Sequence, residues 1–290
     1  MITDTHAHLF WKAFEEDRAE VLARARAAGV GRVIVVGTDL QSSRAAFELC
    51  AQDPDLFPTA GVHPHDSEGA SDEVLEEIRG LCEREECVAV GETGLDYFKE
   101  RSPRAAQRRS FRWHLELAHR LGKPAIVHCR GAHRDAVELL GEAPGVSGVM
   151  HCYTMGPDEL APYLELGLYV SFSGVVTYPR NDANRAAARA VPAARLLVET
   201  DCPFLAPQTR RGRRNEPALV REVLEAVAAL RGVDAGELAL VTSRNAARLF
   251  GLPPVQGQRA DERSAAGVAG DASCSTGRAG PCGPPGPTGP

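Results

Sequence analysis

The sequence predicts an α/β fold, a (β/α)₈ TIM-type barrel over residues 1–252 followed by a disordered tail at 253–290. Short β-branched runs alternate with amphipathic stretches rich in Ala, Leu, Glu and Arg, the pattern of repeated βα units around a parallel sheet. Eight such runs can be counted, and eight strands close a barrel of this kind. The length of the chain agrees with this fold, because one barrel of about 250 residues would take up most of it.

The predicted strands and helices alternate along the first 200 residues. The strands are expected at 2–9, 32–37, 56–63, 87–92, 124–129, 148–152, 168–173 and 195–200. Helices are expected between them at 13–28, 41–51, 71–80, 104–121, 131–141 and 157–165, with a shorter pattern at 182–190.

Two further helical patterns follow the eighth strand and close the domain near residue 252. They are EPALVREVLEAVAALR and SRNAARLF, and Thr242 or Ser243 is the expected N-cap of the second. After Pro253 the composition changes to Gly, Ser, Pro and Ala without periodic apolar residues. Such a segment cannot bury enough apolar surface to fold, so it is predicted to be disordered.

The composition points to a cytoplasmic protein that does not associate with membranes. No run approaches the roughly 18 apolar residues that a membrane span requires, and a polar DTHAH stands where a secretory signal would need an apolar core. The cysteines lack CxxC spacing and predict reduced thiols. A formal net charge of −6 disfavours broad electrostatic binding of a nucleic-acid duplex, so phosphate recognition would come from a local cluster such as RRGRR at 210–214.

Polar side chains fall at the carboxyl ends of the predicted strands, which form the active-site face of a barrel. Imidazoles and carboxylates that converge there without a surplus of cations usually need a divalent metal ion. The candidate metal ligands are His6, His8, Glu92, His128, His151 and Asp201. This set exceeds the three protein ligands of a typical mononuclear catalytic zinc site, so two ions are predicted.

Glu92 is placed to bridge the two predicted ions. Two sets of ligands are expected to share it: His6, His8, Glu92 and Asp201 for one ion, and Glu92, His128 and His151 for the other. Asp201 could also take a proton from the attacking water. The next residues along the chain, Cys129, Cys152 and Cys202, should point to the opposite face and pack against the helices.

An ordered set of short motifs resembles the TatD family of metal-dependent deoxyribonucleases, within the amidohydrolase superfamily. The motifs are DTHAH, GVHPHD, VGETGLDY, VHCR, HCY, SFSG, ETDCPFLAP with RGRRNEP, and NAARLF, and they span roughly residues 1–252. The resemblance implies a two-metal site at the six positions; His and carboxylate ligands accept Mg²⁺, Mn²⁺, Zn²⁺ and other divalent ions, so the identity of the ions stays open. It also implies phosphodiester hydrolysis with DNA as the substrate, most simply as a 3′-5′ exonuclease on single strands; no obligate protein partner is evident.

Three more residues are assigned to the site. Arg130 and Arg211 are expected to contact phosphate, because guanidinium binds it bidentately. The alternatives are an ion pair with an acid for Arg130 and a solvated basic loop for 210–214. His63 is the expected substrate contact or proton donor, with support of a metal ligand as its alternative. Asp4 is expected to be buried structure, and Asp96 to shape the loop over the site.

Other reactions remain open at this stage. The same ions polarise carbonyls, so an amide, ester or lactone could be hydrolysed, including the ester of aminoacyl-tRNA. Many binuclear amidohydrolases use a carboxylated barrel lysine as the bridge, but the lysines here, Lys12, Lys99 and Lys123, lie in loops or at the opposite end. A non-catalytic nucleic-acid or metal-binding protein is disfavoured, because all six ligands are present.

Overall fold

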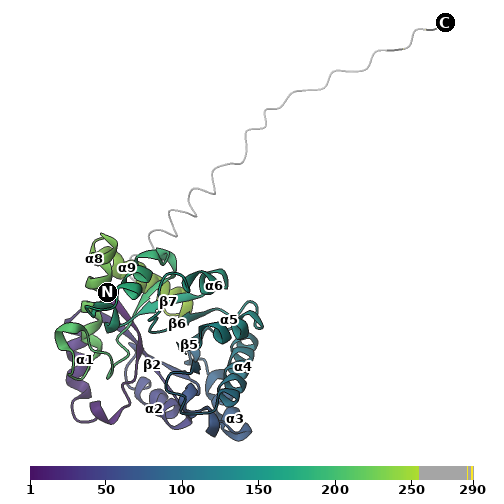
Figure 1. Cartoon of the computed structure of the whole chain (residues 1–290), viewed down its shortest axis with the longest axis horizontal. Helices are drawn as coiled ribbons and strands as arrows, with labels where there is room; N and C mark the ends of the chain where they lie inside the picture. Colours follow the sequence, from purple (N-terminus) through teal and green to yellow (C-terminus); the bar gives the residue numbers. More distant parts are fainter. Residues whose placement is uncertain (255–285, 287–288, 290) are drawn as a thin grey trace. The chain divides into compact units, whose positions relative to one another are not determined.

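The computed structural model describes residues 1–254, 286 and 289, and eight parallel strands form a barrel in sequence order (Figure 1). The strands are β1 (Ile2–Ala7), β2 (Val30–Val36), β3 (Leu56–Ala60), β4 (Ala89–Asp96), β5 (Ala125–Arg130), β6 (Gly148–Met150), β7 (Tyr169–Phe172) and β8 (Leu196–Val198). A parallel bridge between Ala7 and Cys202 joins the first and last strands. The predicted (β/α)₈ fold is therefore confirmed.

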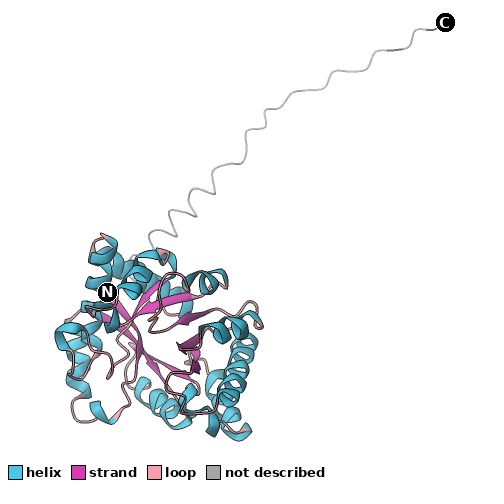
Figure 2. Ribbon diagram, viewed as in Figure 1, coloured by secondary structure: helices cyan, strands magenta, loops and turns pink. Residues whose placement is uncertain are grey.

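Helices surround the strands, as Figure 2 shows. They are α1 (Arg18–Ala27), α2 (Leu40–Cys50), α3 (Asp72–Glu83), α4 (Arg104–Leu121), α5 (His133–Gly141), α6 (Leu160–Glu165), α7 (Asp182–Ala190), α8 (Val220–Arg231) and α9 (Ala235–Phe250). Each predicted helix has a counterpart, including the short one at 182–190. Within residues 1–254, no helix is both long and apolar enough to cross a bilayer. Nearly all of the predicted tail, from residue 255 onward, lies outside the described residues.

The barrel interior is apolar at one end and polar at the other. Ile34, Ile126 and Leu197 form a buried cluster with Phe250 of α9, so α9 packs against the amino ends of the strands. Because strand residues alternate in direction, the positions two further along point into the same interior. Those positions include His128 after Ile126 and Glu199 after Leu197, two polar side chains of the site.

Strand β4 runs four residues beyond its predicted end at Glu92, and it pairs with β5 as far as Asp96 and Arg130. The extension depends on Gly94, which has φ 136° and lies opposite His128. A Cβ atom built on Gly94 would lie 2.0 Å from the His128 carbonyl oxygen, so only glycine lets β4 approach β5 this closely. The two strands therefore stay paired beside the site.

The predicted start of the last helix was wrong. Helix α9 begins at Ala235, and its N-cap is Asp234, whose side chain accepts a hydrogen bond from the Glu237 N–H at 3.0 Å. Thr242 and Ser243 lie in the middle of this helix. The Thr242 hydroxyl donates to the Leu238 carbonyl at 3.0 Å, a bond that a mid-helix threonine can form without ending the helix.

Replacing Asp234 with alanine should lower the free energy of unfolding by about 1 kcal/mol, because it removes the acceptor for the first turn of α9. Urea denaturation followed by circular dichroism would measure the change. Asp234→Asn keeps a side-chain acceptor and serves as the control. An equal loss in both variants would show that the charge of Asp234, and not the cap, stabilises the helix.

Candidate metal centre

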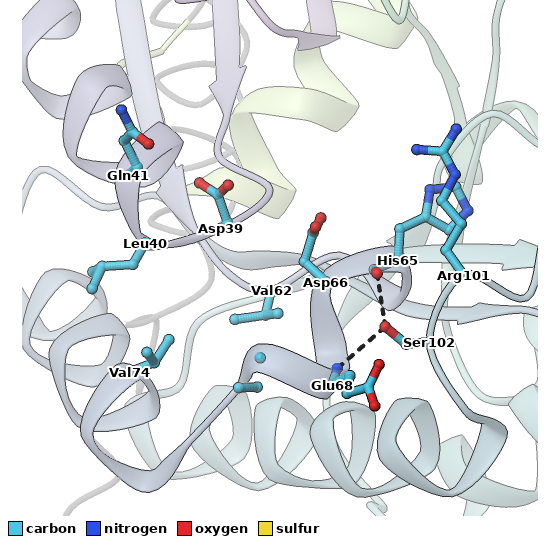
Figure 3. Close-up of a pocket in the computed structure, with 12 residues that line it drawn as sticks. Asp39, Leu40, Gln41, Val62, His65, Asp66, Glu68, Val74, Arg101 and Ser102 are labelled. Atoms are coloured by element: carbon cyan, nitrogen blue, oxygen red, sulfur yellow. Dashed lines mark hydrogen bonds between the residues drawn. The ribbon is translucent and has the colours of Figure 1, made fainter.

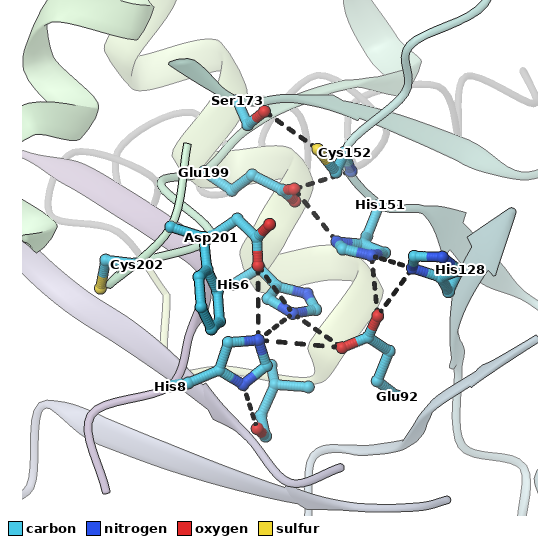
Figure 4. A network of polar contacts seen from close by, with 12 residues as sticks. His6, His8, Glu92, His128, His151, Cys152, Ser173, Glu199, Asp201 and Cys202 are labelled. Atoms are coloured by element: carbon cyan, nitrogen blue, oxygen red, sulfur yellow. Dashed lines mark hydrogen bonds and ion pairs between the residues drawn. The ribbon is translucent and has the colours of Figure 1, made fainter. Parts of the chain in front are cut away.

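All six predicted ligands lie in one largely buried cluster at the carboxyl ends of the strands (Figure 4). On its first side, His6 Nε2 lies 3.2 Å from His8 Nε2 and 3.2 Å from Glu92 Oε2. His8 Nε2 lies 3.3 Å from Asp201 Oδ1. Four side chains from β1, β4 and the segment after β8 therefore point their donor atoms at one another.

The other oxygen of Glu92 faces a second group of histidines. Glu92 Oε1 lies 2.9 Å from His151 Nε2, 3.0 Å from His128 Nδ1 and 3.4 Å from His63 Nε2. His128 Nδ1 and His151 Nε2 are 3.3 Å apart. Burial alone would raise the pKa of Glu92, but the surrounding histidines hold it well below its usual range. An ionised carboxylate thus presents one oxygen to each group.

The outer nitrogens of His8 and His128 are held by acceptors. The His8 Nδ1–H donates to the Val36 carbonyl at 2.8 Å, which leaves the Nε2 lone pair free toward the cluster. His128 Nε2 lies 3.3 Å from Asp96 Oδ2, which leaves its Nδ1 free toward Glu92. Burial alone would raise the pKa of Asp96, but its hydrogen bond with His128 helps to lower it, so Asp96 accepts as a carboxylate.

His151 is oriented in the same way by Glu199. His151 Nδ1 lies 3.2 Å from Glu199 Oε1, and the same oxygen accepts from the Cys152 N–H at 2.7 Å. The carboxylate fixes the tautomer that leaves His151 Nε2 free. His6 differs, because its Nδ1 is buried and has no hydrogen-bond partner within the described chain. Three of the four predicted histidine ligands thus have the outer hydrogen bond that metal-binding histidines usually make.

His63 has the opposite arrangement. Its Nδ1 accepts a hydrogen bond from the His65 N–H at 3.0 Å, so the neutral ring carries its proton on Nε2. That proton points toward Glu92 Oε1, although simple proximity groups His63 with Glu92 and His128 as possible ligands. Burial holds the pKa of His63 well below its usual range, which keeps the ring neutral. The hydrogen bonds therefore separate His63 from His8, His128 and His151, whose inner nitrogens are left free toward the cluster.

The backbone turns sharply where Asp201 enters the cluster. Asp201 has φ 58°, in the left-handed region that Asp tolerates better than most residues. Its N–H donates to the His6 carbonyl at 2.9 Å. Behind it, the buried Asp4 carboxylate accepts from the Thr200 N–H at 2.9 Å and from the Thr200 hydroxyl at 2.6 Å. Asp4 is thus buried structure, as predicted, and it fixes the segment that carries Asp201.

The donor set fits divalent metal ions. Two ligands of a tetrahedral ion about 2.1 Å away are separated by about 3.4 Å, close to the spacings between His6, His8 and Glu92. The lone pair of His8 Nε2 faces His6 Nε2 at 3.2 Å, and a cation between the two rings would be bound by both nitrogens once His6 Nε2 is unprotonated. His6, His8 and Glu92 form one group with the spacing of a metal site.

Sequence reasoning missed Glu199 entirely, and it missed the contacts that Asp96 makes with His128 and His65. Asp96 shapes the loop after β4 as expected, because its Oδ1 accepts from the Phe98 and Lys99 N–H groups at 3.0 and 2.8 Å. Its Oδ2 also lies 2.9 Å from His65 Nε2, a contact that was not predicted. Glu199 could have been found, because it precedes Asp201 by two positions and so points into the same interior. The signal for Asp96 was equally simple, since it shares its parity with Glu92, but the predicted strand ended too early.

A family model described as TatD related DNase matches residues 3–251. The chain belongs to the TatD family. This membership confirms the prediction of a metal-dependent hydrolase that acts on ester bonds.

Some of the similar proteins are named for a substrate and others are not. The uncharacterized metal-dependent hydrolase YabD of Bacillus subtilis is 39% identical over 252 residues, which cover 86% of this chain and 99% of that protein. The 3′-5′ ssDNA/RNA exonuclease TatD of Erwinia tasmaniensis is 39% identical over 257 residues, covering 86% and 99%. The crystal structure of the TatD homologue YJJV from Escherichia coli matches with a TM-score of 0.82 and 31% identity, covering 87% and 98%.

The cluster of this TatD-family protein opens into a cavity of about 820 Å³. Arg130 lines it, and its guanidinium lies 4.1 Å from the ring centre of Phe98. Within residues 1–254, Arg130 has no ion pair with an acid, which was its alternative role. Arg211 does not line the cavity; its guanidinium lies 4.4 Å from the ring centre of Tyr178, which does. A second cavity of about 530 Å³ adjoins this one and shares Asp39, His65, Asp66 and Arg101 with it (Figure 3).

The three cysteines next to the ligands are not part of the cluster. Cys202 is buried and points away from it (Figure 4). Cys152 Sγ lies 3.0 Å from the Ser173 hydroxyl, and Cys129 Sγ lies 3.7 Å from the Tyr163 hydroxyl. Cys129 and Cys152 also border the cavity, so their packing is less complete than predicted. All six cysteines of the described residues are free thiols.

Proposed function

We propose that this TatD-family hydrolase is a 3′-5′ exonuclease that cleaves single-stranded DNA at a centre of two divalent ions. The proposal is based on the position of Glu92, whose two carboxylate oxygens face two separate groups of imidazole nitrogens. Relatives of comparable identity are named 3′-5′ ssDNA/RNA exonucleases, which supports the substrate class.

The residues that would hold the ions are those whose donor atoms point into the cluster. His6, His8, Asp201 and Glu92 Oε2 would hold one ion, and the second would lie between Glu92 Oε1, His128 and His151. Bound divalent ions supply a nucleophile from water at neutral pH and neutralise charge on the phosphate. Asp96 and Glu199 would keep His128 and His151 in the binding tautomer.

Three side chains of the chain itself would act on the substrate. Asp201 would accept the proton of the attacking water. Burial alone would raise its pKa, but the hydrogen bond with His8 and the nearby histidines lower it, so the carboxylate is ionised. Arg130, at the cavity wall, would hold the non-bridging phosphate oxygens. The neutral His63 would position the substrate by donating a hydrogen bond from its Nε2–H to a substrate oxygen.

The test uses single-stranded DNA labelled at the 5′ or the 3′ end, with and without a chelator. We expect mononucleotides to be released from the 3′ end, the reaction to stop with chelator, and added Mg²⁺, Mn²⁺ or Zn²⁺ to restore it. Metal analysis of the purified protein should give two ions per chain. Internal cleavage, cleavage that survives chelation, or a single ion would each contradict part of the proposal. Bound metal without DNA cleavage would favour ester substrates such as aminoacyl-tRNA.

Arg211→Ala should weaken binding of single-stranded DNA more than it slows hydrolysis of a small phosphodiester, because Arg211 lies beyond the cavity, beside Tyr178. Loss of one phosphate contact should reduce the slope of log affinity against log salt by about 0.7 for a single strand. Fluorescence anisotropy over a salt series would measure it. Arg221→Ala, an exposed arginine of α8, is the control. Equal losses on both substrates would assign Arg211 a structural role.

A further inference from the structure

The cavity at the metal centre has an aromatic wall. Trp11 and Phe204 both line it, and each keeps 42% of its surface exposed. Their ring centres are 5.1 Å apart and their planes meet at 87°, so the two rings form a corner. Phe204 lies 6.2 Å from the imidazole of His8, ring centre to ring centre. The wall therefore begins beside the metal ligands.

Exposed aromatic side chains gather at this face of the barrel. In the part of the chain that the structure describes, six large apolar side chains are exposed: Met1, Trp11, Phe98, Phe204, Val233 and Leu240. The three aromatic ones follow the carboxyl ends of β1, β4 and β8. Exposed apolar groups that gather at a cavity usually mark a surface that a ligand covers.

Cationic side chains lie on the other side of the cavity. Lys99 and Arg101 follow β4, Arg130 is the last residue of β5, and all three line the cavity. In the closed order of eight strands, β4 and β5 lie across the barrel from β1 and β8, which carry the aromatic wall. The cavity thus offers rings on one side and positive charge on the other.

We propose that Trp11 and Phe204 form a stacking site for a nucleobase of the strand whose phosphate lies at the metal centre. The inference rests on the proposed function, and it names the residues that would make the enzyme prefer single-stranded over double-stranded DNA. Aromatic side chains bind bases of any sequence through their ring faces, while cations follow the backbone. A duplex keeps its bases paired and stacked inward, so only a single strand, or a frayed end, can place a base against Trp11.

The first test compares two single strands of equal length, one with all its bases and one with abasic sites in place of the bases. Wild-type enzyme should cleave the base-bearing strand with the higher kcat/KM. In Trp11→Ala and Phe204→Ala this preference should fall by about tenfold, the effect expected of one stacked base. Trp11→Phe should retain most of it. Leu240→Ala, an exposed apolar residue of α9, should leave the preference unchanged.

The second test does not require cleavage. Trp11 and Trp113 are the two tryptophans of the chain, so Trp113→Phe leaves Trp11 as the single tryptophan, which can be excited selectively. Titration of the metal-loaded protein with a nuclease-resistant phosphorothioate single strand should quench Trp11 in a saturable way. The abasic strand should quench much less, and Phe204→Ala should weaken the apparent affinity by about tenfold.

The outcomes separate the stacking site from the proposed nuclease. If DNA is cleaved but Trp11 is not quenched, and both alanine variants lose equally on the two strands, the stacking site is wrong and the nuclease stands. If no DNA is cleaved but quenching depends on bases, the stacking site stands and the nuclease is wrong. If neither cleavage nor quenching occurs, both are overturned.

Discussion

We expect Glu92→Ala to lose both metal ions and most activity together. Each oxygen of Glu92 faces a different group of histidine nitrogens, at 3.2 Å from His6 and 2.9 Å from His151. Replacing residues that only orient metal ligands typically costs 10- to 100-fold in affinity or activity, so loss of a shared ligand should exceed about 100-fold. Metal analysis of the dialysed protein and initial rates of hydrolysis would measure both effects.

A second variant, Glu92→Asp, tests whether the carboxylate must reach both groups of histidines. Aspartate keeps the charge but shortens the side chain by one methylene, so it can reach one group of histidines more readily than both. We expect it to retain more metal than the alanine variant while still losing activity. Glu138→Ala, an exposed glutamate of α5, controls for the loss of a carboxylate elsewhere. Turnover at wild-type metal content in Glu92→Ala would show that Glu92 does not bridge two ions.

The fold could be predicted because each strand and helix of a parallel barrel can be recognised from its own short stretch of sequence. Each strand is a short run of β-branched residues between turn signals, and the count of eight determines closure. The predicted start of α9 was wrong for a local reason as well. Asp234 begins the helix, but Gly236 follows within its first turn, and glycine disfavours a helix interior. The packing of α9 against the amino ends of the barrel strands outweighs that preference.

The positions of the proposed ligands could be predicted, but the residues that hold them by hydrogen bonds largely could not. Strand parity places His128 in the barrel interior, and His151 and Asp201 come shortly after the ends of β6 and β8, so the sequence alone indicates all three positions. The role of Asp96 depends on the pairing of β4 with β5, which continues only because of Gly94. The tautomer of His63 depends on the backbone N–H of His65. Pairing partners and backbone donors of this kind are decided by the folded structure.

We expect Asp201→Asn to lose activity with a smaller loss of metal than Glu92→Ala. Asp201 faces only the first group, 3.3 Å from His8 Nε2, and asparagine keeps an oxygen in that place. The amide oxygen is a far weaker base than the carboxylate, so the attacking water would lose its proton acceptor. Removal of a general base typically costs about 10²- to 10⁴-fold in rate. Single-turnover rates at saturating metal would isolate this step.

A comparison with Glu199→Gln distinguishes proton transfer from simple orientation. Glu199 contacts His151 and the Cys152 N–H, so its replacement should cost about 10- to 100-fold, through weaker positioning of His151. That loss should be relieved in part by excess metal, because positioning acts through affinity. The loss in Asp201→Asn should persist at saturating metal, because no added ion replaces a proton acceptor. If excess metal restores Asp201→Asn fully, Asp201 acts as a ligand alone, and the proton must leave by another group.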